Sequence, residues 1–196
     1  MATLHETAYP RLKPDPTAKE LEEIYTPSAA EIAFAKQLTT QPGPQLAVLI
    51  HLKLFQRLGY FTLLAEVPER IRQHIAKAAR LGRVLASDQL DRYDSSGSKR
   101  RHMPQLRQFI GVRPLDKSGL SWLDTVATAA AQTKHTIPDI VNVLLEELVH
   151  HRYELPGFRT LEMAAIGARE RVNLGYYRSI SHALTPATRT LIDELL

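Results

Sequence analysis

The segment 95–115 contains no aspartate or glutamate, although it carries five fixed positive charges. Three of its apolar residues are spaced as on the buried side of a helix: Leu106, Phe109 and Ile110. Arg107 and Gln108 fall between them, on the other side. Duplex DNA requires this combination, because phosphates attract fixed cations and base edges accept bidentate contacts from Arg or Gln. The segment therefore suggests a short basic helix that contacts DNA. A solvated helix surface that only keeps the protein in solution explains the charges equally well.

Two other expected helices carry polar groups that core packing does not explain. The first runs from Gln45 to Leu58, and the second begins at Val67-Pro68 and ends at Gly82. Together with the basic segment they supply the side chains that we expect to bind DNA: Gln45, Lys53, Arg57, Arg72, Lys99, Arg100, Arg101, His102, Gln105, Arg107 and Arg113. Within this set Gln105 and Arg107 are best suited to reading bases, and the other cations to holding phosphates.

The remaining titratable groups give weak arguments for a metal site or an active site. Glu146 and His150 share one helix face, but no third and fourth ligand stands at a spacing that zinc would require. Asp88, Asp91 and Asp94 could surround a cation, yet they could equally pair with neighbouring Arg92 or Lys99. Catalytic motifs and glycine-rich phosphate loops are absent from the sequence, and so is cysteine. We therefore expect no catalytic residues, no metal site and no cofactor in this chain.

The elements that must position the basic segment are helical throughout, so the sequence predicts an all-α fold. An extended arm is expected over 1–20, a first helix-turn-helix-like module over 21–85 and a second over 86–196. Several starts and stops support this division. Ser28 and Glu31 have the spacing of a capping box, Gly59 and Gly111 follow helix ends, and Pro138 opens an apolar helix that runs to Val149. Further helices are expected over 103–110, 121–133 and 157–184.

Composition places the protein among water-soluble binding proteins. The 196 residues carry a formal charge of +4, with positive charge concentrated at 70–83, at 99–113 and around Arg169–Arg178. Neither a signal peptide nor a membrane-length apolar run is present in the sequence, so we expect a cytoplasmic protein without a membrane partner. The last residues stop inside an amphipathic pattern, which suggests a chain truncated before the downstream part of a longer parent.

The order of several motifs resembles the N-terminal region of transposases from replicative class II transposons, the Tn-three family. The similarity covers roughly residues 20–184 and depends on order and spacing rather than on any single motif. Its parts are Pro44-Gln45-Leu46 with Leu52-Lys53-Leu54-Phe55-Gln56-Arg57-Leu58-Gly59-Tyr60-Phe61, then Val67-Pro68, then Tyr93 with Lys99-Arg100-Arg101-His102, Arg107 and Ile110-Gly111-Val112-Arg113, and finally Arg152-Tyr153-Glu154-Leu155-Pro156-Gly157 with Leu161 and Ala168-Arg169. One departure is that the family's Ile-Arg step reads Leu106-Arg107 here.

The resemblance implies sequence-specific binding of double-stranded DNA at the terminal inverted repeats of a transposon. It also implies that the catalytic Asp-Asp-Glu domain of the parent transposase, with its magnesium ions, lies downstream and outside this chain. This chain would then be no enzyme, and the bacterial parent would be associated with the nucleoid and could self-associate.

Two other functions remain open from the residues alone. The apolar helix 138–149 could make the chain a protein-interaction or dimerisation module with only non-specific affinity for DNA. The other is a small stand-alone enzyme, although the sequence contains no convergent set of acid, base and nucleophile that would support it. Tyr176, Tyr177 and Arg178 could stack on bases, although an aromatic pair of this kind more often belongs to a core.

Overall fold

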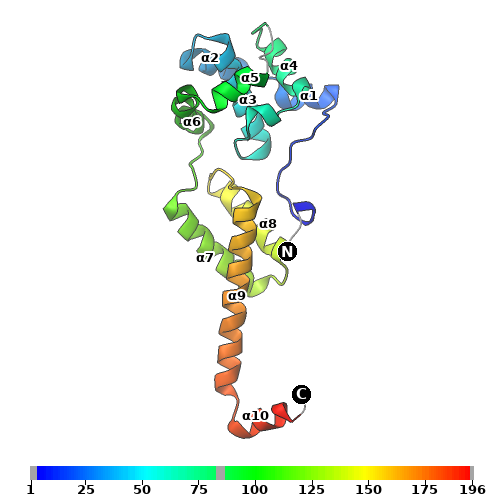
Figure 1. The fold of residues 1–196 in the computed structure, drawn as a ribbon, viewed down its shortest axis with the longest axis vertical. Helices are drawn as coiled ribbons and strands as arrows, with labels where there is room; N and C mark the ends of the chain where they lie inside the picture. Colours follow the sequence, from blue (N-terminus) through cyan, green and yellow to red (C-terminus); the bar gives the residue numbers. More distant parts are fainter. Residues whose placement is uncertain (1–3, 83–86, 195–196) are drawn as a thin grey trace. The chain divides into compact units, whose positions relative to one another are not determined.

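The computed structural model describes residues 4–82 and 87–194. Within these stretches the regular elements are ten α-helices and two short 3-10 turns, Leu4–Glu6 and Leu64–Glu66 (Figure 1). The one extended pairing in the same stretches is an isolated parallel bridge between Arg113 and Tyr153. The predicted all-α fold is confirmed. None of the helices in the described part is both long enough and apolar enough to cross a membrane.

The chain divides into two compact units, and each is built from separate stretches of sequence. The N-terminal unit comprises Pro10–Pro114 and His151–Leu155, and the C-terminal unit comprises Met1–Tyr9, Leu115–His150 and Pro156–Leu196. The boundary expected between residues 85 and 86 lies outside the described residues. The helices on both sides of it nevertheless belong to the N-terminal unit, because Leu90 and Leu106 share one buried cluster with Leu21. The basic helix therefore belongs with the first module and not with the second.

In the N-terminal unit one buried helix is surrounded by the others. This central helix, α3 (Pro42–Leu58), is apolar on almost every side and buries most of its residues, as expected for a helix with neighbours all round. The helices packed against it are α1 (Ala18–Tyr25), α2 (Ala29–Leu38), α4 (Glu69–Ala78), α5 (Ser87–Asp94) and α6 (Gly97–Ile110). Gly59 ends α3 with φ of 75°.

The helix ends in this unit follow the local sequence signals, with a difference at the end of α4. The capping box of Ser28 and Glu31 is present as predicted, and Thr17 with Glu20 forms a second one. Helix α4 stops at Ala78 rather than at Gly82. The N–H of Leu81 bonds back to Ala76 O at 3.0 Å while Arg80 takes a left-handed φ of 56°, which closes the helix early.

The C-terminal unit is a three-helix core with a projecting continuation. Its helices are α7 (Lys117–Thr133), α8 (Ile137–His150), α9 (Phe158–Ala183) and α10 (Pro186–Asp193), and α7, α8 and α9 pack against one another. Alanines at the α7–α9 contact allow close approach: Ala127, Ala130, Ala131, Ala165 and Ala168. The apolar side of α8, expected as an interaction surface, is buried inside this core.

Two further features of the C-terminal unit depart from expectation. Near the start of the chain Asn142 accepts a hydrogen bond from Ala8 N at 2.8 Å, and the Tyr9 hydroxyl donates to Pro156 O at 2.9 Å. The expected arm is therefore held at these points. Tyr176 and Tyr177 are not core residues in the described chain, because they are 52% and 67% exposed on the second half of α9.

Candidate nucleic-acid interface

A tight turn fixes α6 against the N-terminal unit. Ser95 and Ser96 connect α5 to α6, so the two helices form a helix-turn-helix pair that packs on α3. The Ser96 hydroxyl accepts from Lys99 N at 3.2 Å and donates to Tyr93 O at 2.7 Å. One side chain therefore caps α6 and also holds it to the end of α5. Helix α6 begins six residues before the expected position, because Pro104 is accommodated inside it and does not start it.

The inner face of α6 is anchored by packing and by buried polar contacts. His102, Met103 and Leu106 are buried. The Tyr93 hydroxyl lies 2.8 Å from His102 Nδ1, and Phe109 stacks on Phe34 with ring centroids 4.1 Å apart. These contacts fix the rotation of the helix about its axis, and that rotation decides which side chains face solvent.

Asp94 links three parts of this anchor. Its carboxylate accepts from Leu64 N at 2.7 Å and from Lys99 Nζ at 2.6 Å. His51 Nε2 lies 3.8 Å from the same carboxylate, and neither ring nitrogen of His51 has a hydrogen-bond partner within the described residues. Burial, together with Lys99, lowers the pKa of His51 to about 3 despite the nearby Asp94. Burial and Arg101 also lower the pKa of His102. Both histidines are therefore neutral near pH 7, and the charge of this region comes from its arginines and lysines.

The outer face of α6 is polar, basic and exposed. Its exposed polar residues are Arg100, Arg101, Gln105 and Gln108, and Pro104 and the 42% exposed Phe109 lie among the exposed residues of α6 as well. Within the described residues Arg101 and Gln105 make local hydrogen bonds, to Ser98 Oγ at 3.2 Å and to Arg101 O at 3.1 Å respectively. Solvent-facing contacts of this kind are exchanged at small cost. The first turn of α6 contains no acidic residue, so its positive end is not neutralised there.

A hollow lies beside the first turn of α6, between the start of α3 and the α5–α6 pair. Its volume is about 410 Å³, and among the side chains that the structure describes its lining contains a single charged one, Arg92, and no acidic one. The other lining residues are Gln41, Gly43, Pro44, Gln89, Tyr93, Ser96 and Ser98. The N-termini of α3 and α6 thus border a hollow whose electrostatics favour an anion.

Three of the expected DNA-binding side chains lie inside the protein instead. Gln45 is 8% exposed and donates to Thr39 O at 2.8 Å, which closes the α2–α3 turn. Lys53 is 9% exposed, with its Nζ 3.5 Å from Glu31 Oε1. His102 is buried as described above. A surface role for Gln45 and Lys53 was expected from the polar positions of α3. Both are buried in this central helix, where Thr39 O and Glu31 are their partners. Half-buried Lys99 is likewise engaged, by Asp94.

Two arginines at the end of the basic segment hold a distant piece of chain. Arg107 Nε lies 2.8 Å from Glu154 Oε2, and its guanidinium lies over Phe61, 5.3 Å from the ring centroid. Arg113 lies over Tyr153 at 4.1 Å. Backbone hydrogen bonds join the same two segments, since Arg113 N donates to Arg152 O and Glu154 N donates to Arg113 O. We call residues 151–155 the clasp. Sequence reasoning missed its role, because no local signal shows which part of the chain it contacts.

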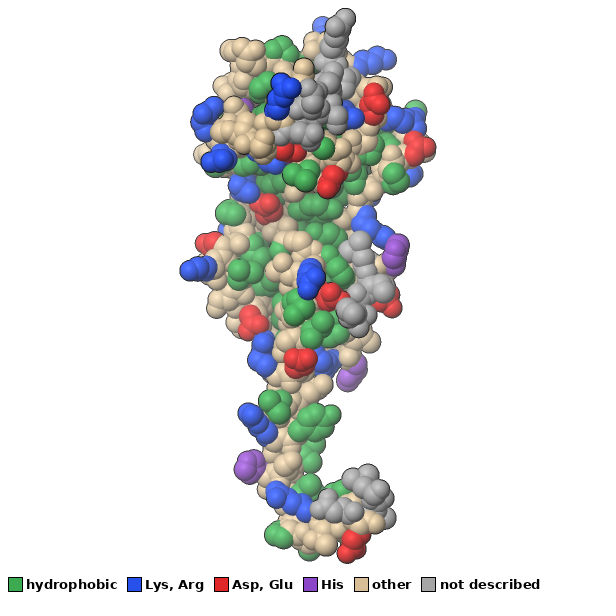
Figure 2. All heavy atoms as spheres, viewed as in Figure 1, with side chains coloured by type: hydrophobic (Ala, Val, Ile, Leu, Met, Phe, Trp, Pro, Cys, Tyr) green, Lys and Arg blue, Asp and Glu red, His purple; other side chains and the backbone are tan. Residues whose placement is uncertain are grey.

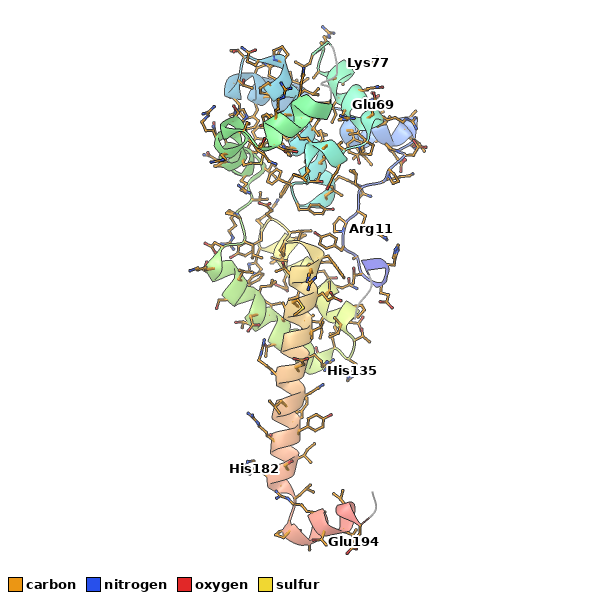
Figure 3. The ribbon with its side chains drawn as sticks, in the orientation of Figure 1. Arg11, Glu69, Lys77, His135, His182 and Glu194 are labelled. Atoms are coloured by element: carbon orange, nitrogen blue, oxygen red, sulfur yellow. The ribbon has the colours of Figure 1, made fainter. Side chains whose placement is uncertain are left out.

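The other expected residues lie apart from α6. Arg57 is exposed in the last turn of α3, and Arg72 is half-buried on α4. Figure 1 shows α4 and α6 on opposite sides of the unit, and Figure 3 marks the two ends of α4 by Glu69 and Lys77. The structure therefore brings together Arg100, Arg101 and Gln105 on α6, while α4, which carries Arg72, lies on the opposite side of the unit.

No metal centre is found in the part of the chain that the structure describes, where no three His, Asp or Glu side chains come together. The side chains of Asp88 and Asp91 lie outside the description, so the proposed acidic series is represented by Asp94 alone. That carboxylate is occupied by Leu64 N and Lys99.

Comparison with known proteins gives one match. A search of curated proteins and a search of solved structures each found no match. A family model matches residues 1–168, which include all of the N-terminal unit and most of the three-helix core. The chain therefore belongs to the family described as "Domain of unknown function (DUF4158)".

Proposed function

We propose that this chain binds double-stranded DNA through α6, as the non-catalytic N-terminal part of a transposase that recognises the terminal inverted repeats of its transposon. The observation that carries the proposal is the geometry of α6. A short turn holds the helix on a buried core, and its outer face presents arginines and glutamines without an acid. In helix-turn-helix proteins the second helix of such a pair enters the major groove and contacts base edges there.

The side chains of α6 divide into two roles on this proposal. Arg100 and Arg101 lie in the first turns, beside the hollow bordered by two helix N-termini, and would neutralise phosphates. Gln105 and Gln108 lie farther along the exposed face, where an amide can contact adenine with two hydrogen bonds. Arg107 is assigned no base contact, because Glu154 and Phe61 already hold it.

The assignment to transposon ends comes from the motif resemblance to the Tn-three family and is the finer part of the proposal. The motif segments 93–113 and 152–157 of that resemblance meet in one structure, since Arg107 and Arg113 bind the clasp. This agreement between motif order and contact is a reason to favour one common fold for the matching region.

A salt titration of binding to a labelled inverted-repeat duplex from the source element tests the proposal. Replacing Arg100 and Arg101 by Ala should reduce the slope of log affinity against log salt by about two. The matched control replaces Lys117 and Lys134, exposed cations of the C-terminal unit, and should leave the slope unchanged. Gln105→Ala should weaken the free energy of binding to the cognate duplex by about 1–3 kcal/mol, and to a scrambled duplex by much less. Equal affinity of the unaltered chain for both duplexes would remove the claim of specificity.

The alternative function is a helical protein-interaction module with non-specific affinity for DNA. The surface first expected for it, on 138–149, is not accessible because Ile140, Leu144 and Leu148 are buried. On this alternative, replacing Arg100 and Arg101 would lower the affinity for the cognate and the scrambled duplex equally. Gln105→Ala would change the affinity for neither duplex.

A further inference from the structure

The face of α9 turned away from the three-helix core exposes two apolar residues among small and charged ones. Leu161, Ala165 and Ala168 are buried against α7 and α8. At 3.6 residues per turn, Met163 and Leu174 fall on the other face, where they are 55% and 48% exposed. Figure 2 shows hydrophobic and basic side chains alongside one another on the projecting half of this helix. We call the face from Met163 to Ser181 the α9 ridge.

The charges on this ridge are arranged symmetrically about Leu174. Glu170 lies four residues before it and Arg178 four residues after it, and both are exposed. Neither side chain makes a hydrogen bond or an ion pair within the residues that the structure describes. Two small residues, Gly167 and Ser181, lie seven positions away on either side. Small residues at such positions reduce the bulk between two helices, and at Gly167 the Arg171 guanidinium lies beside the backbone, with Nη1 3.4 Å from where a Cβ would stand.

We propose that a second copy of this chain docks on the α9 ridge, forming an antiparallel α9–α9 pair centred on Leu174. In that arrangement Leu174 meets Leu174, and each Glu170 lies beside Arg178 of the second copy. Gly167 of one chain then lies opposite Ser181 of the other. The surface is self-complementary, as a two-fold interface must be. A parallel pair would instead place Glu170 against Glu170 and Arg178 against Arg178, which like-charge repulsion disfavours.

The size of the ridge indicates a weak, reversible pair. Eighteen residues separate Met163 from Ser181, so the ridge is about 27 Å long at 1.5 Å per residue. One helix pair of this length buries a small interface, of the kind found in transient complexes. We expect a dissociation constant in the micromolar range.

Cysteine cross-linking in the full chain tests this geometry, and the natural sequence has no cysteine to interfere. Leu174→Cys should form a disulfide-linked dimer under mild oxidation. A mixture of Gly167→Cys and Ser181→Cys chains, one of them carrying a mass tag, should give the mixed dimer in preference to either homodimer. A Cβ at Gly167 meets only Arg171 Nη1, at 3.4 Å, so that variant is expected to fold. Leu63→Cys, at a 52% exposed position in the N-terminal unit, is the control for random collision.

Sedimentation of the cysteine-free chain over a concentration series provides the second measurement. Glu170→Arg alone or Arg178→Glu alone should raise the dissociation constant at least tenfold, and the double exchange should restore it. Circular dichroism checks that each variant keeps its helices. A monomer at all concentrations without a 174–174 cross-link overturns the proposal, and so does preferred formation of 167–167 and 181–181 dimers. Both measurements are made without DNA, so they succeed or fail independently of the proposed DNA binding.

Discussion

Arg107 and Glu154 form an ion pair at 2.8 Å, although 47 residues separate them in the sequence. Glu154 belongs to the clasp, which reaches the N-terminal unit only after α7 and α8 have been completed. Leu155 N also donates to Gly59 O at 2.8 Å, so the clasp contacts the end of α3 as well as the end of α6. The cations of the basic segment therefore serve two purposes, with Arg107 and Arg113 holding the fold and Arg100 and Arg101 left facing solvent.

Replacing Arg107 or Glu154 by Ala should lower the free energy of unfolding of the N-terminal unit. The two side chains are 25% and 21% exposed, so solvent screening keeps their coupling energy to about 1 kcal/mol. Chemical denaturation of both single variants and the double variant gives this coupling directly. The salt slope of DNA binding should not change in Glu154→Ala. A coupling energy of zero would show that the pair does not hold the clasp.

Gly59→Ala should destabilise the protein more than Gly111→Ala does. Both glycines have φ of 75°, so each substitution forces a side chain into the left-handed region at about 1–2 kcal/mol. A Cβ at Gly59 would also lie 2.9 Å from Leu155 Cδ1, whereas a Cβ at Gly111 meets nothing within 4 Å. The difference between the two thermal midpoints measures this contact with the clasp, and equal midpoints would contradict it.

His51 should make the stability of the N-terminal unit fall as the pH is lowered from about 6.5 toward 3. Its pKa drops from 6.5 to about 3 on folding, so in this range the unfolded chain binds the additional proton and protonation favours unfolding. His51→Leu should reduce the loss of stability between pH 7 and pH 5 by about 2 kcal/mol.

Denaturant titrations at the two pH values measure this loss. His135→Leu, at an exposed position labelled in Figure 3, serves as the control and should leave the loss unchanged. The same pH dependence with and without His51 would assign the effect to other groups.

Asp94→Ala should lower the free energy of unfolding by about 3–5 kcal/mol, because it leaves Leu64 N and the ammonium of half-buried Lys99 without their acceptor. The matched control is Asp124→Ala, which removes a carboxylate 2.6 Å from Arg171 where both side chains are about half exposed. That exposed pair should contribute less than about 1 kcal/mol. Similar losses in the two variants, measured by denaturation, would argue against a structural role for the Asp94 carboxylate.

Local sequence signals predicted most helix positions well, but they predicted poorly which helices pack against one another. The Ser28–Glu31 capping box, Gly59 after α3 and the apolar helix from Ile137 are all confirmed, because each depends on residues within a few positions. The start of α6 was predicted too late, since Pro104 resembles a first-turn proline while Ser96 provides the actual cap.

The surface of the candidate site could be predicted only in part, because long-range packing decides which polar residues remain exposed. Gln45 and Lys53 are buried because five helices surround α3, and nothing in the spacing of α3 shows that number. Arg107 is engaged because the clasp returns from far along the chain. Gln105 was expected on the basic helix and is exposed there, whereas Arg100 and Arg101 are exposed on a first part of α6 that lies before the expected start at residue 103.

The clasp makes the N-terminal unit discontinuous in sequence, and this affects both its biosynthesis and its dissection. During translation α1–α6 leave the ribosome before residues 151–155, so the unit must wait with the Leu155 contact site open until α8 has been synthesised. A fragment that stops at Pro114 would lack the partners of Arg107, Arg113 and Gly59 permanently. Loss of DNA binding in such a fragment would therefore be explained by incomplete folding of the unit, and would not show that a direct contact to DNA is missing. A fragment that extends through Leu155 is the shortest one in which the α6 surface can be examined on its own scaffold.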